Sequence, residues 1–366
     1  MNPTSSRRSA SDAMKSLLLI GLLAVSCLPV VAQYDDDDAT RDYEEQDRRY
    51  LERLKGLQKP EVERGAIVAP SAAFLERAEK LVRDKNFSSA RTARYFLQSD
   101  DPRLDAQATV EFLEVFRDYF DEFWQGRIEL APYDKTSRVF LLYSFYKYNQ
   151  LLAGDFRFSP IRPQGHYGSL YDVISLHSDA DGGPGSTADA LIHEAAHQLV
   201  AQRIFGGEPA PAYWLTEGLA SYFGYTFLDA KTGFRTEMIG GKSVSIFFGA
   251  KNKPGQEAKL VLKESGKVFK ADAKTHDTPL VARLLAIDSP VDFYTEQPRL
   301  NYAAAWLLVH TLFHADDGRY RDGFLRYLTH EVTGGGGVTA LYRELSLDAA
   351  GLQDAFERHV KKLKAR

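Results

Sequence analysis

The sequence predicts an α+β fold in which a small α/β part, residues 60–185, precedes a mostly helical part, residues 186–366. In the first part, short apolar runs typical of strands alternate with segments at helical spacing, whereas predicted helices dominate the second part. The composition, 44% hydrophobic and 26% charged over 366 residues, is typical of a folded protein with one or two domains.

Residues 1–32 are expected to form an export signal. Basic residues precede the apolar run 17–25, which is too short to span a bilayer, and small residues up to Ala32 fit a signal-peptidase site. An alternative is a lipid anchor, because "AVSC" loosely matches a bacterial lipobox in which Cys27 becomes the lipidated first residue. Both possibilities predict an exported protein with no membrane span.

Residues 33–58 are charge-dense and poor in apolar residues, which predicts an acidic, solvated tether. A calcium site at Asp35–Asp38 is the alternative. Cys27 is the only cysteine, so cleavage after Ala32 leaves no thiol for a disulfide or for zinc ligation. The net charge of −4 offers no basic surface, so neither nucleic acid nor an anionic membrane is an expected partner.

The α/β part is predicted to contain helices and strands in mixed order. The patterns place helices over 74–84 and 105–124, and strands over 93–99, 137–145 and 168–179. The phenylalanines of the longer helix follow one stripe, which indicates packing in a core. The last strand is expected either at the edge of a sheet or inside it.

The stretch "LIHEAAHQLV", residues 191–200, carries the first candidate site. His193 and His197 lie four residues apart, so a helix places both on one face, where they can bind one metal ion. Glu194 follows the first histidine at a position suited to a general base. Ser186 is expected to cap this helix, with Asp189 completing a capping box. The alternative is a buried helix whose histidines only form hydrogen bonds.

A catalytic zinc site needs three protein ligands and one open position. Without cysteine, the third ligand has to be another histidine or a carboxylate. Glu217 follows His197 by twenty residues, inside a second predicted helix that begins after Pro211. If the two helices pack side by side, Glu217 can reach the same ion.

These two segments resemble those of the gluzincin metallopeptidases, in which HExxH is followed by a helix-borne glutamate ligand. "WLTEGLASYF" is similar to the segment around that glutamate in aminopeptidase-type members, and the overall layout resembles exported bacterial peptidase-like proteins. The resemblance covers about residues 165–315. It implies a zincin-like metallopeptidase fold and one Zn²⁺ per chain, with His193, His197 and Glu217 as ligands and Glu194 as the base.

A third segment, "NYAAAWLLVHTLF", resembles the helix whose tyrosine stabilises the oxyanion in the same group. This implies a catalytic role for Tyr302, and His310 on the same helix is the alternative. Two features depart from the family. Ser221 stands where thermolysin-like members often carry an aspartate, and the glycine-x-methionine-glutamate-asparagine motif of aminopeptidases is missing.

The remaining sequence predicts structure more than chemistry. Residues of about 231–298 look like an inserted β-rich or loop segment over the site. Gly334–Gly337 is expected to connect two helices, and residues 347–366 to form an amphipathic C-terminal helix.

The expected function is zinc-dependent hydrolysis of peptide bonds in a peptide or protein substrate, by a secreted, periplasmic or surface-held bacterial enzyme. One alternative is a non-catalytic, zinc-stabilised module that binds peptides or cell-wall components. Another is a zinc amidohydrolase acting on a non-peptide bond. Glu194 favours an enzyme, because a purely structural zinc site has no use for a base.

Overall fold

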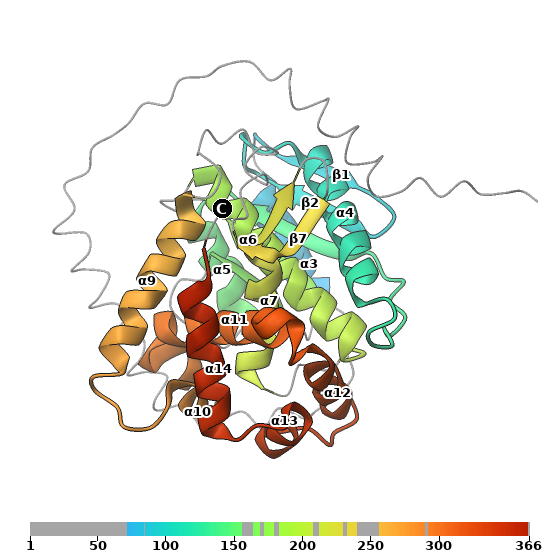
Figure 1. Ribbon diagram of the computed structural model, residues 1–366. Coiled ribbons are helices and arrows are strands. Elements are labelled where there is room, and N and C mark those ends of the chain that lie inside the picture. The colour runs from blue at the N-terminus through green and yellow to red at the C-terminus, as the bar shows by residue number, and fades with distance from the viewer. Residues whose placement is uncertain are drawn as a thin grey trace, which may run out of the picture.

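The computed structural model describes residues 72–83, 85–155, 164–168, 172–178, 183–207, 212–229, 233–239, 256–289 and 292–364. The predicted export signal, the acidic tether and Cys27 all lie outside these residues. In the described part, the protein has a mixed α/β architecture with one five-stranded sheet and a large set of helices (Figure 1). Among the described residues, no helix combines the length and the apolar character needed to cross a membrane.

The five-stranded sheet has the order β1-β2-β3-β5-β4. Its three central strands are parallel, and the strand at each end is antiparallel to its neighbour. The strands are β1 (Ser88–Arg91), β2 (Tyr95–Ser99), β3 (Ser137–Leu142), β4 (Gly165–Gly168) and β5 (Val173–His177). The internal position predicted as one alternative for the strand in 168–179 is therefore confirmed, and the edge position is wrong. The terminal strand next to β5 is β4, which comes before β5 in the chain.

Helices cover both faces of the sheet. On one face lie α3 (Ala72–Val82) and α5 (Phe145–Asp155), whose apolar side chains meet those of β3 and β5. On the other face lie α4 (Ala106–Trp124) and α6 (Gly183–Leu199). The phenylalanine stripe of α4 is largely buried, as predicted, and Asp105 caps this helix by accepting a hydrogen bond from the Ala108 N–H.

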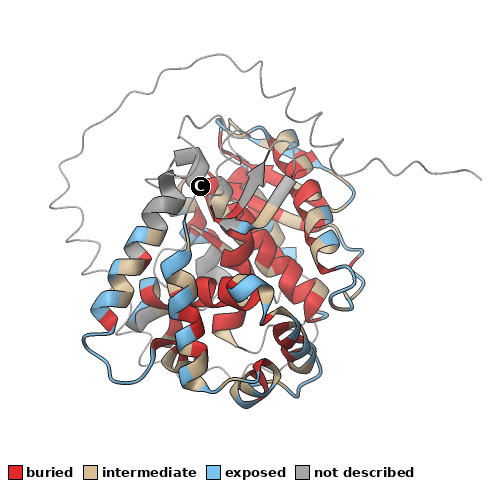
Figure 2. Ribbon diagram, in the orientation of Figure 1, coloured by how far each residue is buried: buried red, intermediate tan, exposed pale blue. Residues whose placement is uncertain are grey.

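Three helices form the centre of the molecule. α7 (Tyr213–Gly224) packs between α6 and α11 (Pro298–His314), and Figure 2 shows that these helices consist mostly of buried residues. A side chain at Gly218 would place Cβ 2.6 Å from the Ala305 carbonyl oxygen, so glycine permits the close approach of α7 and α11. α6 continues into the π-helical turn η2 (Val200–Ile204).

The start of α6 differs from the prediction. The helix begins at Gly183, so Ser186 lies inside its first turn and is not the N-cap; its side chain lies outside the described residues. Pro184 explains the earlier start, because proline fits the first turn of a helix, where its missing N–H has no partner to lose.

Among its described residues, the inserted segment is mostly helical, so the prediction of a β-rich or loop segment is wrong for these residues. A short hairpin, β6 (Thr226–Asp229) and β7 (Gly233–Ile239), is followed by α9 (Gln256–Asp272), α10 (Leu280–Leu285) and the π-helical turn η3 (Asp292–Glu296). Lysines, glycines and alternating apolar positions over 242–277 suggested β structure, but Leu260–Leu262 is a consecutive apolar run, and Phe269 follows Leu262 by two helical turns, which makes a helical stripe. This stripe packs inward, with the Phe269 ring 5.5 Å from that of Phe356.

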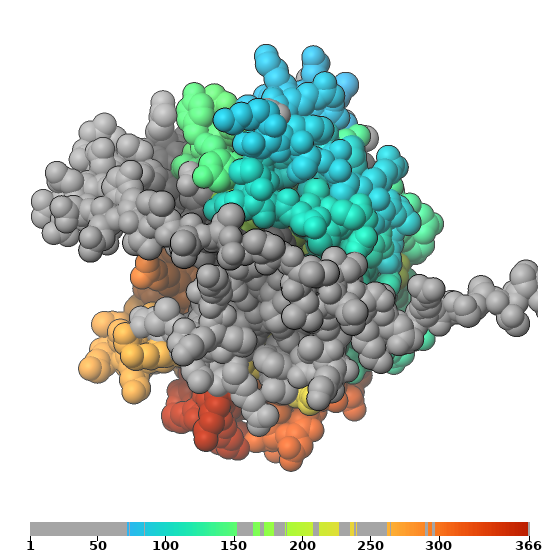
Figure 3. Space-filling view, turned by 90° about the horizontal axis from the view of Figure 1, so that it is seen from above, coloured from blue at the N-terminus to red at the C-terminus, as the bar shows by residue number. Residues whose placement is uncertain are grey.

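The C-terminal part continues with α12 (Arg321–Val332), α13 (Val338–Leu345) and α14 (Ala349–Lys362). The predicted connection at Gly334–Gly337 joins α12 to α13, and the predicted C-terminal helix is α14. Figure 3 shows the segments from residue 72 to about 150 gathered on one side of the molecule and the C-terminal helices on the opposite side.

Candidate metal centre

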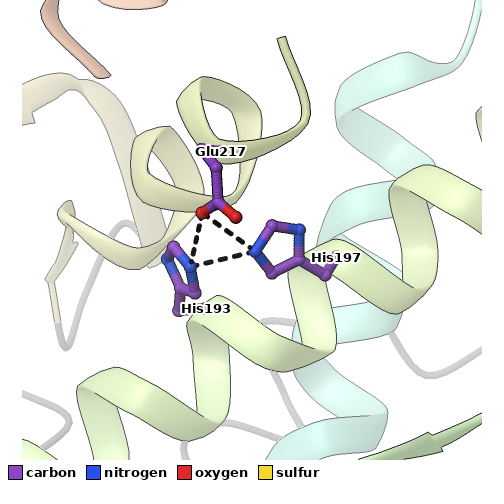
Figure 4. Close-up of side chains that lie close together, drawn as sticks. All are labelled: His193, His197 and Glu217. Carbon is purple, nitrogen blue, oxygen red and sulfur yellow. Dashed lines mark hydrogen bonds and ion pairs between the residues drawn. The ribbon is translucent and has the colours of Figure 1, made fainter. Parts of the chain in front are cut away.

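Two central helices bring the predicted ligands together. His193 and His197 are one turn apart on α6, and Glu217 projects toward them from α7 (Figure 4). The two histidine Nε2 atoms are 3.0 Å apart, and Glu217 Oε2 lies 3.3 Å from that of His193 and 3.2 Å from that of His197. In the part of the chain that the structure describes, this is the one group of three or more such side chains close enough to hold a metal ion.

The geometry of this triangle fits a zinc ion. Ligand bonds of about 2.0–2.1 Å in a tetrahedral site place ligand atoms roughly 3.3 Å from one another, close to the separations observed. Glu217 is 3% exposed, and its Oε2 faces the Nε2 atoms of both histidines. A buried carboxylate is costly unless a cation or hydrogen-bond donors face it, and a metal ion within the triangle would meet that need.

The electrostatics of Glu217 also suit a ligand. Burial by itself raises the pKa of this carboxyl, but His197 and His193 together hold it well below its usual value. Glu217 is therefore a carboxylate at neutral pH. Two imidazoles and one carboxylate are a donor set common in catalytic zinc sites.

Glu194 lies beside the triangle and against the terminal strand β4. A Cβ atom added to Gly165 would stand 2.6 Å from Glu194 Cγ and 3.0 Å from its Oε1, so the two residues are in direct contact. The backbone N–H of Tyr167, two residues along β4, donates to the Glu194 carboxylate. Burial raises the pKa of Glu194 to about 7, which suits a group that gains and loses a proton near neutral pH.

A buried polar network fixes β4 relative to α6. Asp172, in the turn between β4 and β5, accepts hydrogen bonds from the Tyr167 hydroxyl at 3.2 Å and from Gln198 Nε2 at 3.0 Å. The Tyr133 hydroxyl donates to the other oxygen of Asp172, and Gln202 donates to Tyr167. Asp172 has φ of 53°, a strained conformation that such a network can hold. This network holds β4 against the helix that carries Glu194.

Tyr302, the predicted oxyanion donor, lies close to the ligand triangle. Its ring is 6.3 Å from that of His193, measured between centroids. Burial and the carboxylates of Glu217 and Glu194 raise the pKa of the Tyr302 phenol well above its usual value. The hydroxyl therefore keeps its proton at neutral pH and can donate a hydrogen bond.

His310, the predicted alternative to Tyr302, lies in a different cluster. It is 2% exposed, and its Nδ1 is 2.8 Å from Nε2 of His359 on α14. The His310 ring is 4.6 Å from that of His314, which in turn contacts the hydroxyl of Tyr222. These contacts join α11 to α14 and α7, so we assign His310 to the packing of the helices.

Three features of the centre have no counterpart in the sequence prediction. The Tyr294 hydroxyl donates to Glu217 Oε1, from a segment that was expected to form a β-rich or loop insertion. Gly165 contacts Glu194, and its neighbour His166 is half-buried, with a pKa that burial and the charge of His197 lower to about 4. None of these residues belongs to a motif with a fixed spacing, and only the packing of β4 and η3 shows them.

Comparison with known proteins adds no assignment. No family model matches this chain, and a search of curated proteins found no match. Conclusions about function therefore depend on the geometry and chemistry of the centre itself.

Proposed function

We propose that the protein is a zinc-dependent metallopeptidase of the gluzincin type, with a zincin-like fold, that hydrolyses peptide bonds. The observation that carries the proposal is the triangle of His193, His197 and Glu217, with ligand atoms 3.0–3.3 Å apart and Glu194 directly beside it. The five-stranded mixed sheet, covered by helices, is compatible with that fold. Export to the periplasm, the cell surface or the medium is part of the proposal, on the evidence of residues 1–32.

In the proposed hydrolysis, three residues would hold the metal, and Glu194 and Tyr302 would act on the water and the substrate. When bound by the three ligands, zinc would lower the pKa of a water molecule and polarise the carbonyl of the substrate. Glu194 takes up the proton of the attacking water and returns it to the amine of the leaving group. A pKa near 7 suits both transfers. The Tyr302 hydroxyl donates a hydrogen bond to the oxygen that gains negative charge.

Strand β4 is the proposed binding edge for an extended peptide. It is the terminal strand of the sheet, paired with β5 on one side only among the described residues. A substrate that adds to the other side gains main-chain hydrogen bonds. Because β4 contacts Glu194, a peptide bound there lies beside the base.

Replacing Tyr302 with phenylalanine is expected to lower turnover by about a hundredfold, because one oxyanion donor is lost while the ring and its packing remain. KM should change little. Steady-state kinetics on a cleaved peptide measure both quantities, and Tyr342→Phe on α13 is a matched control that should behave like the parent. Near-normal turnover of Tyr302→Phe would remove this residue from the proposed mechanism.

Replacing Gly165 with alanine is expected to lower turnover by about tenfold to a hundredfold, because the new Cβ displaces the Glu194 carboxylate. Zinc content should stay close to that of the parent, whereas thermal stability should fall somewhat, because the Cβ also crowds Leu176 Cδ2 at 3.1 Å in a buried site. Gly266→Ala on α9, where a Cβ meets no atom within 4 Å, is the control. Unchanged hydrolysis by Gly165→Ala would show that β4 does not position the base.

One observation favours this proposal over a non-catalytic zinc-stabilised binding module. Such a module has no need of a buried carboxylate against the metal ligands, yet Glu194 is 7% exposed and held in place by β4. A zinc amidohydrolase would use the same groups on a non-peptide amide. The difference between peptidase and amidohydrolase lies in the substrate alone.

A peptide library tests the proposed function. The purified protein is incubated with a proteome-derived peptide library as isolated, after metal removal by a chelator, and after zinc is restored. We expect cleavage that disappears with the metal and returns with zinc. No cleavage by the zinc-loaded protein, together with hydrolysis of non-peptide amides, would favour the amidohydrolase.

A further inference from the structure

The two oxygens of Glu217 have different surroundings. Oε2 faces the Nε2 atoms of His193 and His197 at 3.3 and 3.2 Å. Oε1 accepts a hydrogen bond from the Tyr294 hydroxyl. One oxygen is therefore directed at the position where a metal would bind, and the other is turned away from it and occupied.

The backbone around Tyr294 is held in an unusual conformation. Tyr294 lies in η3, a π-helix of one turn. Asn301 Nδ2 on α11 donates a hydrogen bond to the Phe293 carbonyl at 2.8 Å. Single π-helical turns are rare and concentrate at functional sites. The Tyr294 ring packs among those of Phe293 at 5.2 Å, Tyr302 at 6.1 Å and Tyr213 at 6.2 Å. The phenol thus has little freedom to leave Glu217.

We infer that Tyr294 is a positioning residue that makes Glu217 a one-oxygen ligand. The inference rests on the proposed zinc site. A carboxylate free to rotate can bind zinc through both oxygens and so fill two coordination positions. A donor held on Oε1 disfavours that arrangement and leaves a position open for water or substrate, which catalysis requires. Hydrogen bonds to metal-binding carboxylates also orient them and strengthen metal binding.

Two measurements on Tyr294→Phe test this role. Its zinc affinity, obtained by competition with a chelating dye, is expected to fall about tenfold to a hundredfold, the usual effect of losing such a partner. The cobalt-substituted proteins provide the spectroscopic evidence. The parent should show the intense visible bands of a four-coordinate ion, and Tyr294→Phe the weaker bands of a five-coordinate ion once Oε1 is released. The parent spectrum tests the inference even if the variant folds poorly.

Tyr213→Phe is the matched control, because it removes a hydroxyl from the same aromatic cluster without touching Glu217; it should keep the parent's affinity and spectrum. Equal zinc affinity and equal cobalt spectra in Tyr294→Phe and the parent would overturn the inference while leaving the proposed zinc site intact. A parent spectrum of a five- or six-coordinate ion would also overturn it. If the parent binds neither metal, both the inference and the proposed function are wrong.

Discussion

Replacing Glu194 with glutamine is expected to leave zinc binding intact and to reduce turnover by about a hundredfold to ten-thousandfold. The amide keeps the size of the side chain, but it cannot take up a proton from the attacking water or return one to the leaving amine. Glu194 lies against Gly165 and accepts the Tyr167 N–H, and the amide oxygen can keep that hydrogen bond. The substitution should therefore lower the rate of hydrolysis and leave the folded structure unchanged.

Zinc content, peptide affinity and hydrolysis rate are to be measured side by side for the parent and Glu194→Gln. A binding module predicts no difference in any of the three. If hydrolysis continues at the parent's rate, Glu194 has no part in the mechanism.

Alanine at any one of His193, His197 and Glu217 is expected to weaken zinc binding by on the order of a hundredfold or more, because each supplies one of three protein ligands. The parent should retain about one zinc per chain after dialysis, and the variants much less. Elemental analysis of the dialysed proteins measures this, with circular dichroism to confirm folding. Glu194→Gln is a useful control, since it changes the residue next to a ligand without removing one.

Full zinc occupancy in all three alanine variants would contradict the ligand set. Loss of zinc from the histidine variants alone would leave Glu217 without a role in binding. In that case its buried Oε2 would serve only as a partner of the two histidines.

The candidate metal-binding group could be predicted from the sequence because the geometry of its two histidines is local. Two histidines four residues apart share a helix face whatever the rest of the fold, and Glu217 needs only that α6 and α7 pack side by side. Tyr302 could be placed only through a resemblance between segments. The structure puts its ring near His193, and its catalytic role remains a prediction.

Features that depend on long-range packing could not be predicted from the sequence. Whether β5 or β4 forms the edge of the sheet depends on strand pairing, which alternation of apolar residues does not specify. The helix α9 was missed because its lysines, its glycine and its short apolar run, Leu260–Leu262, are also compatible with a β-rich segment. Tyr294 and Gly165 contact the centre only because η3 and β4 pack against α7 and α6, and neither contact has a sequence signature.

Anomalous diffraction at the zinc absorption edge, from crystals of the zinc-loaded protein, locates the metal directly. We expect one strong peak per chain, bounded by His193 Nε2, His197 Nε2 and Glu217 Oε2, with bonds of about 2.0–2.1 Å. A peak elsewhere in the molecule, or no peak in crystals grown with excess zinc, would contradict the proposed zinc site.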